Sequence, residues 1–501
     1  MATSEQSFDL GKNSSELAKY VTDMGNRVRL PIPVLIYLLT VVTPILVNVG
    51  PLLLSGLRIF LIIMVVPLGI NLLRGKYGRI LVTDILFGLY VAWAMIALIV
   101  NNPDRVVEFV GAYAVEFLGG YLIGRAYVRK KEDFVALIRL LVIIIVLLLP
   151  FAIFESLTGR PPIIETIRKL PGVSSVGILD IYQRMGLERV QAVFAHPIHY
   201  GLFCSAAFSF VMVGFRGIWS MTMRLIVGAL IGLSVFLSLS SGALLPVILQ
   251  LFLIVWATVF RNFERRWLLL LGLFAFLYVA IDLGSNRTPL KVFFSYATFS
   301  AHNAYWRGII FEWGMINVKG SPIFGIGLHD WVRPHFMRSA SVDNFWLLNA
   351  MTYGIPGFLL LFSGFVVGVL RVSLRRFTGD PILWQLRRAW VFCFIGLSFT
   401  LATVHIWTAV LSFVFFLYGA GMWFVTASDA QTMKGELPDN PEMTKRGMAF
   451  RHNQIGDEKR FSRDMHVAEP TVSVEGNRNG KSHVRSEAPK YTRFDPNDDR
   501  T

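Results

Sequence analysis

The sequence predicts an all-α fold, a polytopic membrane bundle of about twelve transmembrane helices. Three observations support this prediction. Only 16% of the 501 residues are charged, whereas a soluble globular protein carries about 25%. The hydrophobic residues, 54% of the chain, gather in runs of roughly 18 to 25, the length of a helix that crosses a bilayer. Short basic loops also alternate with short loops of low charge, as in a multi-pass membrane protein.

Twelve apolar runs are long enough for this interpretation. We expect spans at 33–50, 53–73, 81–100, 106–127, 135–156, 193–214, 225–239, 242–260, 267–284, 345–370, 389–404 and 407–425. Each span must be helical because lipid offers no partner to an unpaired backbone group. The polar N-terminus contains no apolar signal core, so we expect the first span to stay in the chain.

The charges of the short loops orient the bundle. Basic loops follow the basic N-terminal segment at 74–79, 128–133, 215–224, 261–266 and 371–388. The loops between them, such as 101–105 and 238–242, are poor in charge. Because Lys and Arg are retained on the cytoplasmic side, we expect both chain termini in the cytoplasm. The net charge of +15 is then explained by membrane topology, and we do not expect nucleic-acid binding.

Three parts of the chain differ in composition. Residues 1–30 are a polar cytoplasmic segment, 31–426 form the transmembrane domain, and 427–501 are a charged tail that we expect to be disordered in the cytoplasm. Two outside loops, about 157–192 and 285–342, are long. Loops of this length usually carry function, and we expect the second, between the ninth and tenth spans, to form short helices over the bundle.

Basic residues outnumber acidic ones in the second long loop. Arg287, Arg307 and Arg333 are candidates for binding a phosphate or pyrophosphate, because a guanidinium binds two oxygens at once. The alternative for any single arginine is an ordinary solvated charge. Arg307 differs from the others because it lies in an amphipathic helical stretch, AYWRGIIFEWGM. The Gly325-Ile326-Gly327 segment that follows suits either a tight turn or a close approach to a ligand.

A second candidate site lies at the outer start of the sixth span, which reads FAHPIHYG. His196 and His199 stand one turn apart beside the free N–H groups of a helix start, which attract anions. We therefore consider both as phosphate contacts, with helix capping as the alternative. The sequence shows no third ligand near them, so we do not expect a metal site. Within the spans, Arg58 and Glu116 lie deep, and we expect them to pair with each other or with a ligand head group.

Asp343 and Asn344 lie at the outer start of the tenth span. Asp343 is well placed to be the N-cap of that helix. A carboxylate at the boundary between polar and apolar sequence is also a candidate general base for a hydroxyl group. Both roles are open at this point.

Four segments recur together in one known family. They are RVQAVFAHPIHYG (189–201), SLSSGALLPVIL (238–249), YWRGIIFEWGMI with SPIFGIGL (305–328), and VDNFWLLNAMTYGIPG (342–357). In this order and spacing the chain resembles the O-antigen ligase and Wzy-type polysaccharide polymerase superfamily over roughly residues 180–425. The resemblance implies a glycosyltransferase of the bacterial inner membrane that works on the periplasmic face, together with other polysaccharide assembly and export proteins.

The resemblance also implies the chemistry. The donor is a glycan on undecaprenyl pyrophosphate, an acceptor hydroxyl attacks the anomeric carbon, and the lipid pyrophosphate leaves. No cofactor, metal or nucleotide sugar is expected. Arg307 and Arg189 match the arginines that neutralise the pyrophosphate, and His196, His199, Arg287, Arg333 and Asn344 are the further substrate-binding candidates.

One position departs from the family pattern. Many members have His-Asn where this chain has Asp343-Asn344, which fits the exopolysaccharide polymerase branch better than the ligases. Asp343 or a loop histidine such as His329 would then act as the base. We expect a polymerase of lipid-linked repeat units. A ligase that moves the glycan onto an acceptor and a flippase or transporter are the alternatives, but charges concentrated in outside loops favour surface chemistry over transport.

Overall fold

The computed structural model describes residues 30–49, 52–286, 288–296, 301–337, 339–377 and 379–427. This part is mostly α-helical, as predicted, and contains ten helices that are long and apolar enough to cross a membrane. Two further apolar helices, α2 (Ile32–Val42) and α9 (Met221–Leu237), are shorter. The expected N-terminal segment and C-terminal tail, with Arg287, lie outside the described residues.

Most expected spans coincide with a helix. The long helices are α3 (Gly56–Leu73), α4 (Val82–Asn101), α5 (Val106–Tyr127), α6 (Lys131–Thr158), α10 (Ser241–Val259), α11 (Arg266–Gly284), α13 (Ala301–Gly320), α14 (Phe345–Ser373) and α15 (Pro381–Thr400). The sixth span is α8 (Pro197–Ser205) followed by a π-helical turn, η2 (Phe210–Gly214), and the last is α16 (Thr408–Gly421) with α17 (Trp423–Thr426). Shorter elements in the connections are η1 (Pro103–Arg105), α7 (Pro162–Arg168) and α12 (Pro289–Tyr296).

The first expected span is wrong in its second half. Helix α2 ends at Val42, and two strands follow, β1 (Ile45–Val49) and β2 (Leu52–Ser55). They pair antiparallel, and the short β3 (Ser174–Ser175) pairs with β1 on its other side. Pro44 is the physical reason, because a residue before proline is driven out of the α region, and Thr43 is extended at φ −105°, ψ 100°.

Helices α5 and α16 pack closely through small residues. A Cβ on Gly120 would lie 2.3 Å from the Ser412 carbonyl oxygen, and one on Gly124 would lie 2.1 Å from that of Phe416. Only glycine therefore permits this backbone approach, as is usual where helices associate in a membrane. The register is parallel, with Gly120 beside Ser412 and Gly124 beside Phe416, so the start of α16 lies beside the middle of α5.

Several helix ends meet at one end of the bundle, here named the loop end. Helices α4, α6, α9 and α15 end there, and α5, α8, α10, α14 and α16 begin there. Backbone hydrogen bonds join these ends: Val190 N–H donates to the Leu237 carbonyl at 3.1 Å, and Phe345 N–H donates to those of Leu401 and Val404 at 2.8 and 3.0 Å.

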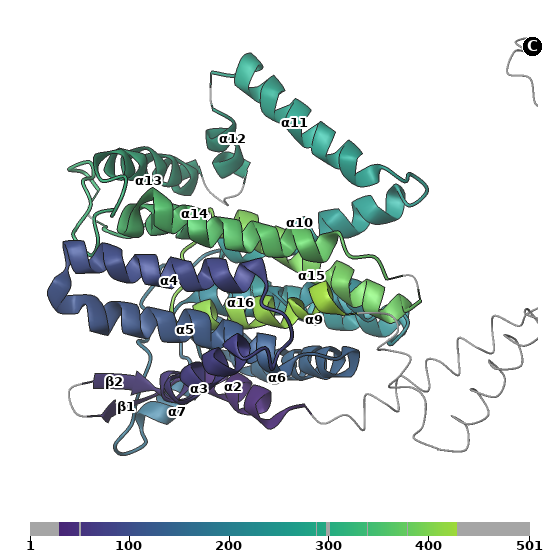
Figure 1. Ribbon diagram of the computed structural model, residues 1–501, viewed down its shortest axis with the longest axis horizontal. Helices are drawn as coiled ribbons and strands as arrows, with labels where there is room; N and C mark the ends of the chain where they lie inside the picture. The colour runs from purple at the N-terminus through teal and green to yellow at the C-terminus, as the bar shows by residue number, and fades with distance from the viewer. Residues whose placement is uncertain are drawn as a thin grey trace, which may run out of the picture. The chain divides into compact units, whose positions relative to one another are not determined.

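The long connection between α11 and α14 folds over the loop end. It contains α13, a 20-residue helix, where short helices were expected. Figure 1 shows α13 alongside α14, and a Cβ on Gly314 would lie 2.6 Å from Leu347 Cδ2. This packing gives Arg307, on α13, a fixed place. Helix α11, in contrast, slants away from α10 and α14 in Figure 1 and buries none of its residues.

Candidate functional site

A buried carboxylate holds the segment that carries Arg189 and His196. Glu155, near the end of α6, accepts hydrogen bonds from the backbone N–H groups of Gln191 at 2.8 Å and Ala192 at 3.0 Å. Ala192 has a φ of 53°, a conformation that costs free energy for a residue with a side chain. Two hydrogen bonds to the Glu155 side chain offset that cost, so this turn is well fixed at the loop end.

His196 is the N-cap of α8. Its Nδ1 accepts a hydrogen bond from the Ile198 backbone N–H at 3.1 Å. Burial first, and then the Arg189 charge, lower the pKa of His196 to about 4, with the Asp343 charge opposing them. Because both charges affect the pKa of His196, the predicted residues Arg189, His196 and Asp343 contribute to one electrostatic environment. The capping role does occur, but it uses only one ring nitrogen and leaves Nε2 for other contacts.

His199 lies deeper in the same helix and is 1% exposed. Its Nε2 is buried without a hydrogen-bond partner. Its ring centroid is 3.9 Å from that of Trp407, at the start of α16. A buried polar atom without a partner costs free energy, which is typical of a binding site rather than of structural packing.

Arg307 lies against the start of α10. A Cβ on Gly242 would be 3.7 Å from Arg307 Nη2, and the Nη1 of Arg307 is buried without a hydrogen-bond partner. Burial lowers the pKa of Arg307, the Asp343 charge opposes this, and the Arg184 charge adds to it. The guanidinium is therefore held near a helix N-terminus, where the backbone also attracts anions.

Arg184 completes this basic site and was not among the predicted residues. Its Nη1 donates to the Leu239 carbonyl at 2.8 Å. Burial first, and then the Arg184 charge, lower the pKa of Arg189 to about 10. We name Arg184, Arg189 and Arg307 the arginine group. In the described part of the chain, none of the three forms a salt bridge with a carboxylate, so the group is suited to bind a multivalent anion.

The N-cap of α14 is Asn344, not Asp343. The Asn344 Oδ1 accepts a hydrogen bond from the Leu347 backbone N–H at 3.0 Å. The capping role considered for Asp343 is therefore wrong, because the helix starts one residue later. The exposed Asp343 carboxylate instead accepts a hydrogen bond from Ser341 Oγ at 2.8 Å. Burial lowers the pKa values of the nearby His196, Arg307 and His405, and the Asp343 charge opposes this effect by raising them.

His405 and Trp407 lie in the connection between α15 and α16, and sequence reasoning missed both. The His405 ring stacks on those of Phe345 and Trp407, with centroid separations of 6.2 and 5.4 Å. Its Nδ1 is buried without a hydrogen-bond partner. Burial lowers the pKa of His405 to about 4, and the Asp343 charge opposes this. The imidazole is thus neutral at pH 7 and lies within electrostatic range of the Asp343 carboxylate.

A cavity of about 660 Å³ opens on the other side of His405 and Trp407. Its wall includes Arg58 and Glu116 from α3 and α5, with Arg58 Nε donating to Glu116 Oε1 at 2.7 Å. The expectation that these two residues pair is confirmed. Segment 405–407 therefore separates the arginine group and its histidines from the cavity.

His329 lines this cavity rather than the arginine group. Its Nε2 lies 3.2 Å from the Asn101 carbonyl oxygen at the end of α4. Gly325 and Gly327 both have positive φ, 68° and 60°. A Cβ on Gly327 would lie 2.3 Å from the Asn102 Oδ1. These glycines allow close packing of the loop against α4 and α14, which is the turn role left open by the sequence.

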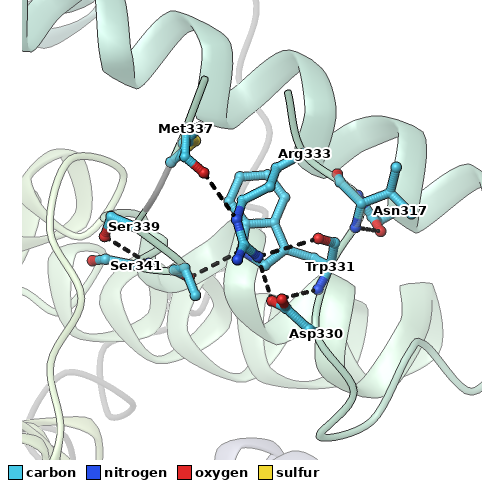
Figure 2. A network of polar contacts seen from close by, with 9 residues as sticks. Asn317, Asp330, Trp331, Arg333, Met337, Ser339 and Ser341 are labelled. Carbon is cyan, nitrogen blue, oxygen red and sulfur yellow. Dashed lines mark hydrogen bonds and ion pairs between the residues drawn. The ribbon is translucent and has the colours of Figure 1, made fainter. Parts of the chain in front are cut away.

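Arg333 stabilises its own loop (Figure 2). It forms an ion pair with Asp330 and donates from Nε to the Met337 carbonyl at 3.2 Å. Asn317 of α13 makes two further hydrogen bonds, each 2.9 Å, with the backbone of Val332. The predicted role of Arg333 in substrate binding gains no support from this arrangement, because its donors face the loop. Their effect is to fix Trp331 in the cavity wall.

Comparison with protein-family models and with curated proteins gave no match. Within the described residues, no three His, Cys, Asp or Glu side chains are grouped so as to hold a metal ion. The function must therefore be inferred from the arginine group, the histidines and the cavity.

Proposed function

We propose that the chain is a membrane glycosyltransferase that polymerises undecaprenyl-pyrophosphate-linked oligosaccharide repeat units. The observation that carries this proposal is the arginine group, which lies next to His196 and His199 at the loop end. Its three guanidinium groups are partly buried, and among the described residues no carboxylate is in ion-pair contact with them. Holding like charges together costs free energy, and a bound pyrophosphate offsets that cost.

The arginine group supports the leaving step. As the bond between the anomeric carbon and the pyrophosphate breaks, the electron pair stays with the pyrophosphate oxygen. Cations already in place stabilise that developing charge without reorganisation, and this is the largest catalytic effect in many enzymes. We assign Arg307 and Arg189 to the pyrophosphate, with Arg184 and the Nε2 of His196 beside them.

The acceptor hydroxyl oxygen forms the new bond to the anomeric carbon, and its proton must pass to a base. We propose His405 Nδ1 as that base, since it is neutral at pH 7, unpartnered and placed between the arginine group and the cavity. Asp343 then stabilises the imidazolium that forms. This arrangement compensates for the histidine that Asp343 replaces in the family pattern, and it leaves His329 outside the reacting centre.

The site would lie on the periplasmic face of the bacterial inner membrane. If the two shorter apolar helices, α2 and α9, also cross the membrane beside the ten long ones, the chain crosses it twelve times. Both termini would then lie in the cytoplasm. The loop end would then be periplasmic, where lipid-linked glycans are polymerised. A cysteine introduced at the exposed Lys319 of α13 should react with a membrane-impermeant maleimide in intact spheroplasts.

A reconstitution tests the proposal. Purified protein in liposomes is mixed with an undecaprenyl-pyrophosphate-linked repeat unit, without nucleotide sugar and with EDTA, and the products are separated on a gel. A ladder of longer lipid-linked glycans is expected. If no ladder forms and the lipid-linked unit instead accumulates inside sealed vesicles, the protein is a transporter and the proposal is wrong.

A further inference from the structure

The cavity differs from the adjoining arginine group in its charge. Among the described residues that line it, Arg58 is the one Arg or Lys, and it is already paired with Glu116. Two more carboxylates, Glu108 and Asp330, stand in the same wall, and each is paired with an arginine outside it. A ligand with a negative charge would therefore find no unpaired Arg or Lys in this wall to offset the loss of its hydration.

The cavity wall combines aromatic faces with hydrogen-bonding groups. Trp331, Trp407, Tyr113 and Tyr353 provide the aromatic rings, and Asn349 contributes an amide. A sugar ring has apolar C–H faces and a rim of hydroxyls, so it matches a wall of this composition. An aromatic side chain supplies a large contact area and, in tyrosine, a polar group at its edge. An acyl chain would exclude water from the paired charges of this wall without giving them any new hydrogen bond.

A chain of hydrogen bonds holds the polar side of the wall rigid. Tyr90 of α4 donates to the Tyr113 hydroxyl at 3.0 Å and lies in hydrogen-bond contact with Asn349. Asn349 in turn donates to the Phe345 carbonyl at 2.7 Å. Phe345 directly follows Asn344 at the start of α14. The first turn of this helix therefore fixes both the cavity wall and the residues beside the arginine group. Such a preformed wall lowers the entropic cost of ordering a ligand.

The position of the cavity identifies which substrate it would hold. In a direct displacement at an anomeric carbon, the attacking hydroxyl and the leaving group lie on opposite faces of the sugar ring. The arginine group marks the leaving-group side, and the cavity lies across His405 and Trp407 from it. We infer that the cavity is the subsite for the terminal sugar of the acceptor, and that it selects a neutral or amino sugar over an acidic one. This inference rests on the proposed function for the identity of the acceptor.

Binding of lipid-free saccharides tests this inference without any turnover. The probe is the repeat-unit oligosaccharide released by mild acid from the lipid-linked intermediates of the cell. A second probe is the same oligosaccharide oxidised at its terminal C6 to a carboxylate. Isothermal titration with the full-length protein in detergent should give at least a tenfold higher Kd for the oxidised probe. Undecaprenyl pyrophosphate should not displace the neutral probe, and Arg307→Ala should leave its Kd unchanged.

Two variants assign the binding to the cavity. Tyr113→Ala should weaken binding of the neutral probe several-fold. Glu108→Lys, at an exposed position in the wall, should reduce the preference for the neutral probe because it adds a cation. Glu264→Lys, in an exposed loop outside the cavity, is the matched control and should change neither Kd.

The outcomes separate this inference from the proposed function. Equal Kd values for the two probes, displacement by undecaprenyl pyrophosphate, or full binding in Tyr113→Ala would overturn the assignment of the cavity. If the reconstitution yields a glycan ladder at the same time, the proposed function still stands. If no ladder forms but the probe binds as described, the cavity is a saccharide site in a protein with another activity.

Discussion

The ring of His199 lies 3.9 Å from the ring of Trp407, measured between centroids, and this contact joins the start of α8 to the start of α16. Trp407 also lines the cavity. One indole therefore lies between His199 and the cavity. Any substrate that reacts between the two must pass beside it, so the residues around it are the ones to test.

Arg307→Ala should lower polymer formation by about 10²–10³-fold, the loss typical of removing one group that stabilises developing negative charge. The protein should still insert and accumulate, because the Arg307 Nη1 has no hydrogen-bond partner to lose. Gel analysis of the glycan ladder, with immunoblots of membrane fractions, measures both effects.

Lys319→Ala is the matched control, since Lys319 is an exposed, positively charged residue on the same helix α13. It should leave the ladder unchanged. Arg307→Lys should retain more activity than Arg307→Ala, because an ammonium keeps the charge but loses the fork of donors. Normal polymer in Arg307→Ala would remove this residue from the site.

Asp343→Asn should lower kcat by about 10²-fold or more, the range that proton transfer contributes, and should leave thermal stability unchanged. The reason is that Asn344, not Asp343, caps α14. Asp343→Glu, which keeps the charge, should retain much more activity. Asn344→Ala should instead lower stability by about 1 kcal/mol, the usual cost of a lost cap, as measured by thermal unfolding in detergent. A fully active Asp343→Asn variant would exclude a role for the carboxylate in proton transfer.

Hydropathy predicted most of this fold because lipid permits few alternatives to a helix. It failed at residues 43–55, where an apolar run rich in Ile, Val and Leu forms β1 and β2. A buried strand and a membrane helix have the same composition over so short a stretch. The prolines at 44 and 51 were the signal that marked the difference.

The site was predicted in part. Arg189, His196, Arg307 and Asp343 were identified from sequence. In the structure His196 lies within electrostatic range of Arg189 and Asp343, and Arg307 within range of Asp343. His405 and Trp407 were missed because a single histidine in a short turn carries no pattern. Tertiary packing of α16 against α5 brings them into place, and no local sequence signal encodes it. The capping residue was misassigned because Asp and Asn cap helices equally well.

The pH dependence of kcat/KM should show an acid limb near pH 4 rather than near pH 6.5. This ratio reports the free enzyme, in which burial lowers the pKa of His405 to about 4, and the base acts only when neutral. His405→Gln should lower kcat by about 10²-fold and remove this limb. An acid limb near the ordinary histidine pKa of about 6.5 would contradict the assignment of His405.

The same groups affect stability. His196 and His405 have lower pKa values in the folded protein, about 4 each, than the value of about 6.5 for an unfolded chain. The unfolded state therefore binds more protons between these values, and the fold should lose stability as pH falls from about 6.5 to 4. His196→Asn keeps the cap and removes one titrating ring, so its melting temperature should depend less on pH over this interval.

Gly242→Ala should impair both stability and activity. Its Cβ would lie 2.3 Å from Val404 Cγ1 and 3.7 Å from Arg307 Nη2, so the start of α10 would have to move away from Val404 and would shift relative to Arg307. Overpacking of this kind costs about 1–3 kcal/mol. Gly308→Ala is the matched control because its Cβ meets no atom within 4 Å, although it adjoins Arg307 in the chain. An exchange of glycine for alanine within a helix stabilises by up to about 1 kcal/mol, so this variant should melt no lower than the wild type and keep full activity. If Gly242→Ala behaves like Gly308→Ala in melting temperature and ladder formation, then the start of α10 does not pack tightly against Val404 in the working enzyme, and this packing does not position the arginine group.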